Sequence, residues 1–252
     1  MSMRELVLDV ETAYTIGAVW GMWEQDVAVV LQDEYILGVG YKYKHLDTVH
    51  WKGLPDFPLY KKEPKNDREL VKFMAELLQD CNLVIGHNVK QFDMKKIRAR
   101  MFYHKLPPLA DPKIFDTKTE VKKRFSYISN KLDDLSRQML DEQKIKHSGI
   151  QLWTRCMDTK YDKKAWLEMG TYCKKDVDLT SRLHDVLSPW SDQNLNWNLD
   201  GDRPKCCPAC GTVSFKQDGK KYFKSFTRQR YRCTRELCKH VWDGEIVPVS
   251  KI

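Results

Sequence analysis

The stretch Leu6-Val7-Leu8-Asp9-Val10-Glu11-Thr12 is an apolar run that carries two carboxylates two residues apart. Alternate side chains of a β-strand point to the same face, so a strand here places Asp9 and Glu11 together. Two carboxylates on a buried strand repel each other and resist desolvation. Their oxygens are the ligands that Mg²⁺ and Mn²⁺ prefer. A lone pair of this kind is more often a solvated strand end, so the interpretation depends on two later stretches.

Those two stretches supply further acids. The run 83–86 predicts a strand that ends in a turn, and Asp93 then falls in the first turn of the next helix. That position lies at the carboxyl edge of the sheet, where open α/β folds form their sites. A long helix is predicted from Lys163 to Leu187, and on it Tyr172 and Asp176 share a face because they are four residues apart.

The hydrophobic pattern predicts an α/β fold with a mixed sheet flanked by helices. After the first strand, the predicted strands are Val27–Leu31, Tyr35–Tyr43, Thr48–Trp51, 82–86 and Lys113–Asp116, and the predicted helices cover 67–79, 90–103, 130–140 and 163–187. We expect residues 27–51 to form an antiparallel meander beside the first strand. In the connection after Glu11, three aromatic side chains suit either stacking on bases or packing under a loop. They are Tyr14, Trp20 and Trp23.

Composition bounds the class of protein. The 252 residues are 42% hydrophobic and 31% charged, which is typical of a globular protein. No run of 18 apolar residues exists and the first residues lead straight into a strand, so we expect no signal peptide, no membrane span and a cytoplasmic location.

Charge is distributed unevenly along the chain. Residues 1–202 hold 31 Lys+Arg and 31 Asp+Glu, whereas residues 203–252 hold 12 Lys+Arg and 4 Asp+Glu. The basic tail predicts a polyanionic partner; a solubilising tail is the alternative.

Five of the eight cysteines lie in that tail and predict a zinc ribbon. The predicted ligands are Cys207, Cys210, Cys233 and Cys238. The second pair has four intervening residues instead of the usual two, so Cys206 and His240 remain alternative ligands. Between the pairs, Asp218-Gly219 predicts a hairpin turn, and aromatic residues alternate with Lys and Arg. That mixture suits nucleic-acid binding, although the aromatic residues could instead form the ribbon's small core.

Taken together, the three acidic stretches resemble the DEDD exonucleases of the DnaQ-like, ribonuclease H-like superfamily. Motif I corresponds to Asp9-Val10-Glu11-Thr12, motif II runs from Asn88 through Phe92 to Asp93, and motif III is Tyr172-x3-Asp176. The tyrosine, where the sister subclass has a histidine five residues before the aspartate, places the resemblance with the DEDDy type. The motif spacing resembles most the proofreading domain of family B DNA polymerases, and the whole chain resembles stand-alone, phage-type exonucleases that end in a zinc ribbon.

The resemblance covers residues 4–190 and implies roles for individual side chains. Asp9, Glu11, Asp93 and Asp176 would hold two Mg²⁺ or Mn²⁺ ions about 4 Å apart, and these ions would activate a water and stabilise the leaving 3′ oxygen. Tyr172 would orient the attacking water. The substrate contacts would be Thr12, Asn88 and Phe92. The resemblance implies a ribonuclease H-like exonuclease domain at 1–190. Polar composition predicts a linker at 191–203, and the cysteines and basic charge predict a nucleic-acid-binding zinc ribbon at 204–252.

The sequence therefore predicts a metal-dependent 3′→5′ exonuclease. Its substrate would be single-stranded or frayed DNA, its products nucleoside 5′-monophosphates, and its further partner a DNA polymerase or replication protein in proofreading or DNA processing. An exoribonuclease of the same superfamily is one alternative, because discrimination depends on the 2′-hydroxyl. A catalytically idle nucleic-acid-binding adaptor is another, and the four intact acids with Tyr172 argue against it.

Overall fold

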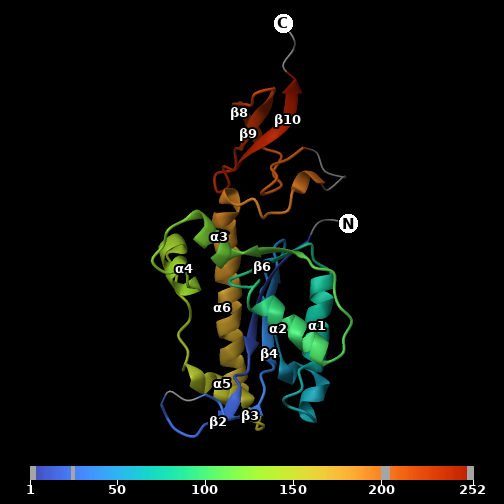
Figure 1. Ribbon diagram of the computed structural model, residues 1–252, viewed down its shortest axis with the longest axis vertical. Coiled ribbons are helices and arrows are strands. Elements are labelled where there is room, and N and C mark those ends of the chain that lie inside the picture. Colours follow the sequence, from blue (N-terminus) through green and yellow to red (C-terminus); the bar gives the residue numbers. More distant parts are fainter. Residues whose placement is uncertain (1–3, 24–25, 200–204, 249–252) are drawn as a thin grey trace.

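A five-stranded mixed sheet forms the centre of the molecule, with the strand order β5-β4-β1-β6-β7. The computed structural model describes residues 4–23, 26–199 and 205–248 (Figure 1). The strands are β1 (Glu5–Thr12), β4 (Ile36–Tyr43), β5 (His50–Gly53), β6 (Leu83–Gly86) and β7 (Lys113–Asp116). β4 pairs antiparallel with β1 and β5, whereas β6 pairs parallel with β1 and β7. This arrangement confirms the predicted α/β fold of the ribonuclease H-like kind.

Helices cover both faces of the sheet (Figure 1). They are α1 (Arg68–Gln79), α2 (Asp93–Tyr103), α3 (Thr117–Arg124), α4 (Leu132–Leu140), α5 (Ile150–Met157) and α6 (Lys163–Leu187). Short 3₁₀ turns lie at Leu54–Asp56, Pro58–Lys61, Ser188–Trp190 and Trp197–Leu199. α1 and α2 lie against one face, and α6 lies along the other with α3 and α4 beside it (Figure 1).

The alternation along β1 decides which face receives the acids. Leu6, Leu8 and Val10 enter the core cluster that contains α1 and α2, whereas Val7 packs with residues of α4 and α6. Since Asp9 and Glu11 follow Val7 at intervals of two, they also face α6. An apolar strand with this pattern therefore delivers its carboxylates to the helix that carries the third predicted motif.

Several elements of the central domain differ from the prediction. Residues Val29–Gln32 form β3, which pairs with β2 (Ile16–Ala18) in a separate two-stranded sheet, so the prediction that 27–31 belongs to the central meander is wrong. β4 pairs directly with β1 and leaves no place for β3 beside it. The helix predicted from residue 90 begins at Asp93 because the preceding residues form a loop. The short helices α3 and α5 were not predicted.

The C-terminal module is a three-stranded antiparallel sheet with the order β10-β9-β8. Its strands are β8 (Phe215–Tyr222), β9 (Phe226–Cys233) and β10 (Val241–Pro248). The hairpin turn predicted at Asp218-Gly219 is wrong: these residues lie inside β8, at a register shift between Gln217 and Lys220. Gly219 adopts φ 76°, which suits the extra residue of a bulge, and Arg230 and Arg232 both pair with Asp218.

This module contacts the C-terminal end of α6 (Figure 1). The ring nitrogen Nδ1 of His240 lies 2.8 Å from the carbonyl oxygen of Pro189. Within the stretch predicted as a linker, Ser191 and Asn194 are buried, and Asn194 bonds to Ser188 through both its amide atoms. None of the helices in the described ranges is long and apolar enough to cross a membrane.

Candidate active site

Four carboxylates from three elements gather between β1 and α6. Glu11, Asp93 and Asp176 are each less than a tenth exposed, and Asp9 retains some exposure. Their charges are close enough to raise one another's pKa values. The thiol of Cys173 on α6 lies 3.5 Å from the Asp9 carboxylate, which brings α6 directly onto the acidic end of β1. The structure thus brings together all four acids that the sequence motifs single out.

The loop after β6 is shaped to deliver Asp93. Asp116, at the end of β7, accepts hydrogen bonds from the backbone N–H groups of Asn88 and Lys90 at 3.1 and 3.0 Å. Asn88 adopts φ 72°, a left-handed conformation that asparagine tolerates better than most residues. Asp93 then accepts a hydrogen bond from the N–H of Val10 at 2.9 Å, which ties α2 to β1.

Asp116 was missed by the sequence analysis, although a signal for it exists. It ends an apolar strand, precedes a helix and caps that helix by accepting from the N–H of Thr119 at 3.1 Å. An aspartate between a strand and a helix is a typical N-cap, and this pattern would have predicted α3 as well.

Lys144 is the second residue that the sequence analysis missed. It lies between α4 and α5, forms an ion pair with Asp176 and donates a hydrogen bond to the Tyr172 hydroxyl at 2.9 Å. Its ammonium also lies 4.9 Å from the centre of the Tyr172 ring. His147 and Trp153 pack against the same ring, with centroid distances of 4.6 and 6.1 Å. Lys144 belongs to no sequence motif, and a lysine in a polar connection is usually solvated, so nothing in the sequence pointed to it.

Burial and mutual repulsion raise the pKa values of the acids. Desolvation is the largest cause in each case, and for Asp9, Glu11 and Asp93 neighbouring carboxylates add to it. The pKa of Glu11 rises to about 8 and that of Asp93 to about 7, while the pKa values of Asp9 and Asp176 also rise. Lys144 acts against this trend for Asp176. A site that holds four such groups strongly favours added positive charge.

The donor set fits divalent cations. One ligand atom each from Asp9, Glu11 and Cys173 lie within 4.8 Å of one another. Atom Oδ1 of Asp176 is buried without a hydrogen-bond partner, which is the state expected of a carboxylate oxygen whose partner is a cation. Asp93 and Asp176 lie outside this group of three, but their charges still raise the pKa of Asp9. All four carboxylates have hard oxygens that suit Mg²⁺ or Mn²⁺, and their role as the ligands of such ions stays a prediction.

The three residues predicted to contact substrate border the same region. Thr12 ends β1, Asn88 lies in the loop after β6, and Phe92 precedes α2 with 37% of its surface exposed. The ammonium of Lys96 lies 5.5 Å from the Phe92 ring centre. Their roles toward a substrate stay predictions.

The tail holds a second cluster, of four cysteines. The thiols of Cys207, Cys210, Cys233 and Cys238 all lie within 4.8 Å of one another. The sulfur atoms of Cys207 and Cys238 lie 3.9 Å apart, and those of Cys210 and Cys233 lie 3.8 Å apart. Four sulfurs at Zn–S distances of about 2.3 Å in a tetrahedron lie roughly 3.8 Å apart, so the cluster is compatible with a zinc ribbon. His240, the alternative ligand, instead stacks on Trp242 and contacts Pro189.

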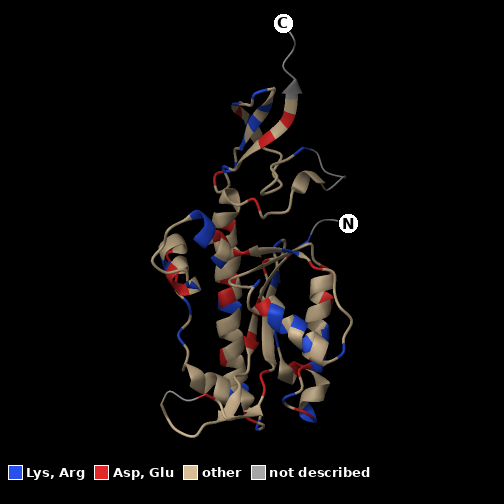
Figure 2. Ribbon diagram, viewed as in Figure 1, with Lys and Arg blue, Asp and Glu red and all other residues tan. Residues whose placement is uncertain are grey.

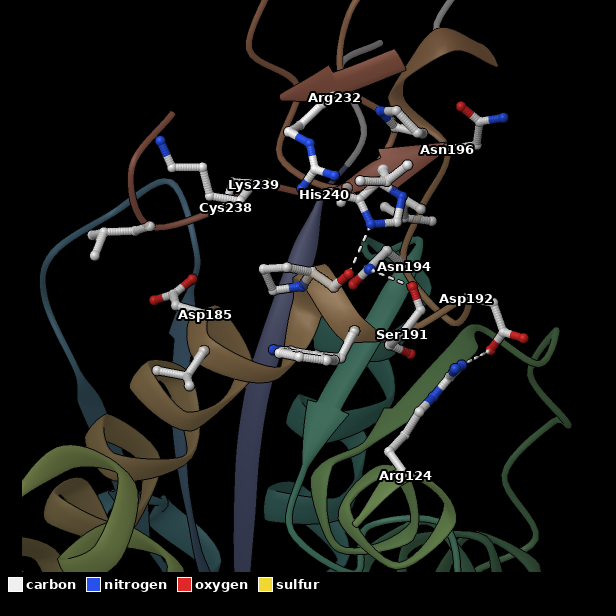
Figure 3. A pocket seen from close by; sticks show the side chains of 18 residues that line it. Arg124, Asp185, Ser191, Asp192, Asn194, Asn196, Arg232, Cys238, Lys239 and His240 are labelled. Atoms are coloured by element: carbon white, nitrogen blue, oxygen red, sulfur yellow. Dashed lines mark hydrogen bonds and ion pairs between the residues drawn. The ribbon is translucent and has the colours of Figure 1, made fainter. Parts of the chain in front are cut away.

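A cavity of about 1020 Å³ lies between the end of α6 and the C-terminal module of residues 205–248, called the cysteine module below (Figure 3). Its lining includes Trp190, His240 and two ion-paired arginines, Arg124 with Asp192 and Arg232 with Asp218. None of the four clustered carboxylates lines it. Figure 2 shows Lys and Arg over β8 and β9, in line with the basic composition of the tail.

Comparison with known proteins bears on the fold and the class of site. A search of curated proteins finds no match. A family model described as the RNase H superfamily matches residues 32–188, from β3 to the end of α6, and so includes Asp93, Tyr172 and Asp176. The matched stretch is more than half of the chain, and the chain therefore belongs to the RNase H superfamily.

Proposed function

We propose that this protein is a metal-dependent 3′→5′ exonuclease that acts on single-stranded or frayed DNA. Membership of the superfamily supports a nuclease-type hydrolase that uses divalent metals. The observation that carries the finer proposal is the convergence of Asp9, Glu11, Asp93 and Asp176, with Tyr172 one helical turn from Asp176. Four carboxylates and one tyrosine are the side chains that the DEDDy resemblance requires.

The residues have separate roles in the proposed reaction. The four acids would hold two divalent ions, which supply a water of lowered pKa and stabilise charge on the leaving 3′ oxygen. Tyr172 orients that water. Desolvation and the neighbouring Asp176 raise the pKa of the Tyr172 hydroxyl above its ordinary value, so the phenol stays protonated and acts as a hydrogen-bond donor, not as a base.

Lys144 supports this role of Tyr172. Because the ammonium donates to the phenol oxygen at 2.9 Å, the hydroxyl proton is directed away from Lys144. Lys144 also neutralises part of the charge on Asp176.

The cysteine module is proposed to bind one zinc ion and the substrate strand. Its basic residues would contact phosphates, and exposed Tyr222 is available for stacking, whereas the Phe223 ring already stacks on Phe226 at 4.5 Å. Tyr231 instead packs against Phe215 and Trp242, at centroid distances of 5.5 and 5.7 Å, so it belongs to the module's own small core.

One assay tests the activity. Single strands of DNA and of RNA, labelled at either end, are incubated with the protein in Mg²⁺, Mn²⁺ or EDTA, with Asp9→Ala as the control. A ladder from the 5′-labelled DNA, a mononucleotide as the first product of the 3′-labelled DNA, and no turnover with EDTA or Asp9→Ala are expected. Internal cuts or 5′-end removal would contradict the proposal, a strong preference for RNA would favour the exoribonuclease, and no turnover at all would favour the idle adaptor.

A further inference from the structure

The hairpin of β2 and β3 exposes an apolar surface that the proposed reaction does not use. None of the described residues from Ile16 to Gln32 is buried. Its large hydrophobic side chains are exposed by 38% to 92%: Ile16, Val19, Trp20, Met22, Trp23, Val27, Val29, Val30 and Leu31. A two-stranded hairpin has little stability by itself, and an exposed apolar surface of this extent marks an interaction site.

Two hydrogen bonds attach the base of the hairpin to the body. The hydroxyl of Tyr14 bonds to Thr154 of α5 at 2.9 Å, and the Gln32 side chain accepts a hydrogen bond from Lys65 at 2.5 Å. Between these points the strands lie at the end of the molecule that is opposite the cysteine module (Figure 1). The two strands pair with each other and, among the described residues, with no further strand, so both outer edges have unpaired backbone groups.

The chemistry of this surface favours protein over nucleic acid. The sequence has no Lys or Arg between Arg4 and Lys42, so nothing in the hairpin neutralises phosphates. Consecutive Val29, Val30 and Leu31 are all exposed, which makes both faces of β3 apolar. Tryptophan and methionine with little charge are typical of the centre of protein–protein interfaces, and homodimer interfaces are the more apolar class.

We propose that the hairpin is the contact surface between two copies of this chain, related by a two-fold axis. An exposed aromatic side chain contributes roughly 150–250 Å² on burial, so Trp20 and Trp23 supply about half of the roughly 800 Å² per partner of a standard interface. The remaining aliphatic side chains supply the rest. Edge strands pair antiparallel with their own copies across a two-fold axis, and a second copy is the one partner always present at matching concentration.

The test is the mass of the purified full-length protein, measured by sedimentation velocity from nanomolar to high micromolar concentrations. Trp20→Asp with Leu31→Asp places charge on the hairpin, where exposure lets the fold tolerate it. Phe102→Asp is the matched control, because Phe102 is 88% exposed and belongs to α2 instead of the hairpin. Circular dichroism shows that each variant is folded.

We expect a dimer for the wild type and for Phe102→Asp, and a shift of the dissociation constant by more than a hundred-fold for the double variant. Amide exchange of residues 16–32 should slow as the protein concentration rises. A wild-type monomer at all concentrations overturns the proposal, and so does a dimer that the double variant leaves intact. A monomer whose affinity for single-stranded DNA falls in the double variant assigns the surface to nucleic acid instead.

Discussion

At the scale of single residues, the carboxylates of the candidate active site repel one another. Glu11 and Asp93 hold pKa values of about 8 and about 7, whereas carboxylates in an unfolded chain titrate near 4. The folded state therefore binds more protons than the unfolded state over this range, and it loses stability as the pH rises through it. The carboxylates that are held together as prospective metal ligands therefore make the metal-free fold less stable.

The first prediction concerns this linkage. In EDTA, the melting temperature should fall between pH 6.5 and 8, and Asp93→Asn should reduce the fall and raise the melting temperature at pH 8. The window starts at 6.5 because His87 and His184, with pKa values lowered to about 4 and about 3 by burial, act in the opposite direction below it.

Thermal unfolding followed by circular dichroism measures this effect. Asp47→Asn, at an exposed position, is the control and should leave the slope unchanged. Mg²⁺ should raise the melting temperature of the wild type most at pH 8. A slope that is identical in Asp93→Asn and the wild type would show that Asp93 does not carry the repulsion.

The second prediction concerns Tyr172. Tyr172→Phe keeps the ring packed against His147 and Trp153 but removes the hydroxyl that Lys144 contacts. We expect single-turnover hydrolysis of a bound oligonucleotide to slow roughly ten- to hundred-fold. DNA affinity in Ca²⁺ should stay the same, and so should the rate of Tyr161→Phe, the control at an exposed tyrosine. An unchanged rate in Tyr172→Phe would reduce Tyr172 to a packing residue.

At the scale of elements, the close approach of α6 to β4 fixes the distance between the motifs. Gly40 pairs with Asp9 in the sheet, and a Cβ atom at Gly40 would lie 2.8 Å from the Cys173 sulfur and 2.9 Å from a methyl of Val177. Real contacts are not this short, so only glycine allows the helix to reach β1. The position of Asp176 relative to Asp9 depends on this contact.

The third prediction follows from that contact. Gly40→Ala should reduce stability by about 1–3 kcal/mol, because added atoms in a packed core force it apart. Turnover at saturating Mg²⁺ should fall by about a hundred-fold, since a shift of about 1 Å between catalytic groups has that effect. Gly244→Ala, which meets Tyr231 at 2.4 Å in the cysteine module, is the control and should leave turnover of a short oligonucleotide unchanged. Equal effects of the two variants on turnover would argue against the role of this contact.

The sequence predicts best those helices and strands whose hydrophobic residues follow a clear spacing. The bounds of α6 and β7 agree with the prediction, because an amphipathic period or a short apolar run between polar residues has one stable solution. The pairing of β3 was predicted wrongly, since its apolar residues suit either the central sheet or a projecting hairpin. Asp67 illustrates a further limit. It directly precedes α1, where an aspartate typically caps a helix, but its side chain is buried between Arg100, His104 and the N–H of Ile36 and makes no cap bond.

The sequence context of each residue explains why the acids of the site were predictable and Lys144 was not. A carboxylate in an apolar strand is an anomaly that only a partner explains, whereas a lysine in a polar connection needs no explanation. Spatial neighbours that are distant in sequence, such as Asp116 and Asn88, appear only when β6 and β7 lie side by side.

At the scale of the whole molecule, two modules of different charge meet at the end of α6. The fourth prediction is that truncation after Gly201 flattens the salt dependence of DNA binding. Each single-strand phosphate neutralised contributes about −0.7 to the slope of log K against log salt, and residues 203–252 hold the whole net charge of +8. Single-turnover cleavage of a short, saturating oligonucleotide should stay close to the full rate, because the acids and Tyr172 remain.

Binding is measured in Ca²⁺ with Asp9→Ala, from low to physiological salt. Cys207→Ser should imitate the truncation, since so small a module depends on its metal for folding. Equal slopes for the full-length and truncated chains would show that the module does not touch nucleic acid and would point to a protein ligand.

The length of α6 sets a scale for the products. From Asp176 to Ser188 the helix rises by about 18 Å, at about 1.5 Å per residue, and the cysteine module begins beyond that end. A stacked strand advances about 3.4 Å per nucleotide, so roughly five or six nucleotides separate the cleaved end from the first phosphate that the module can hold. A strand shortened below that length is released from the basic module while its 3′ end still fits the acids. Digestion should then become distributive, and residual oligonucleotides of this size should accumulate late in the reaction.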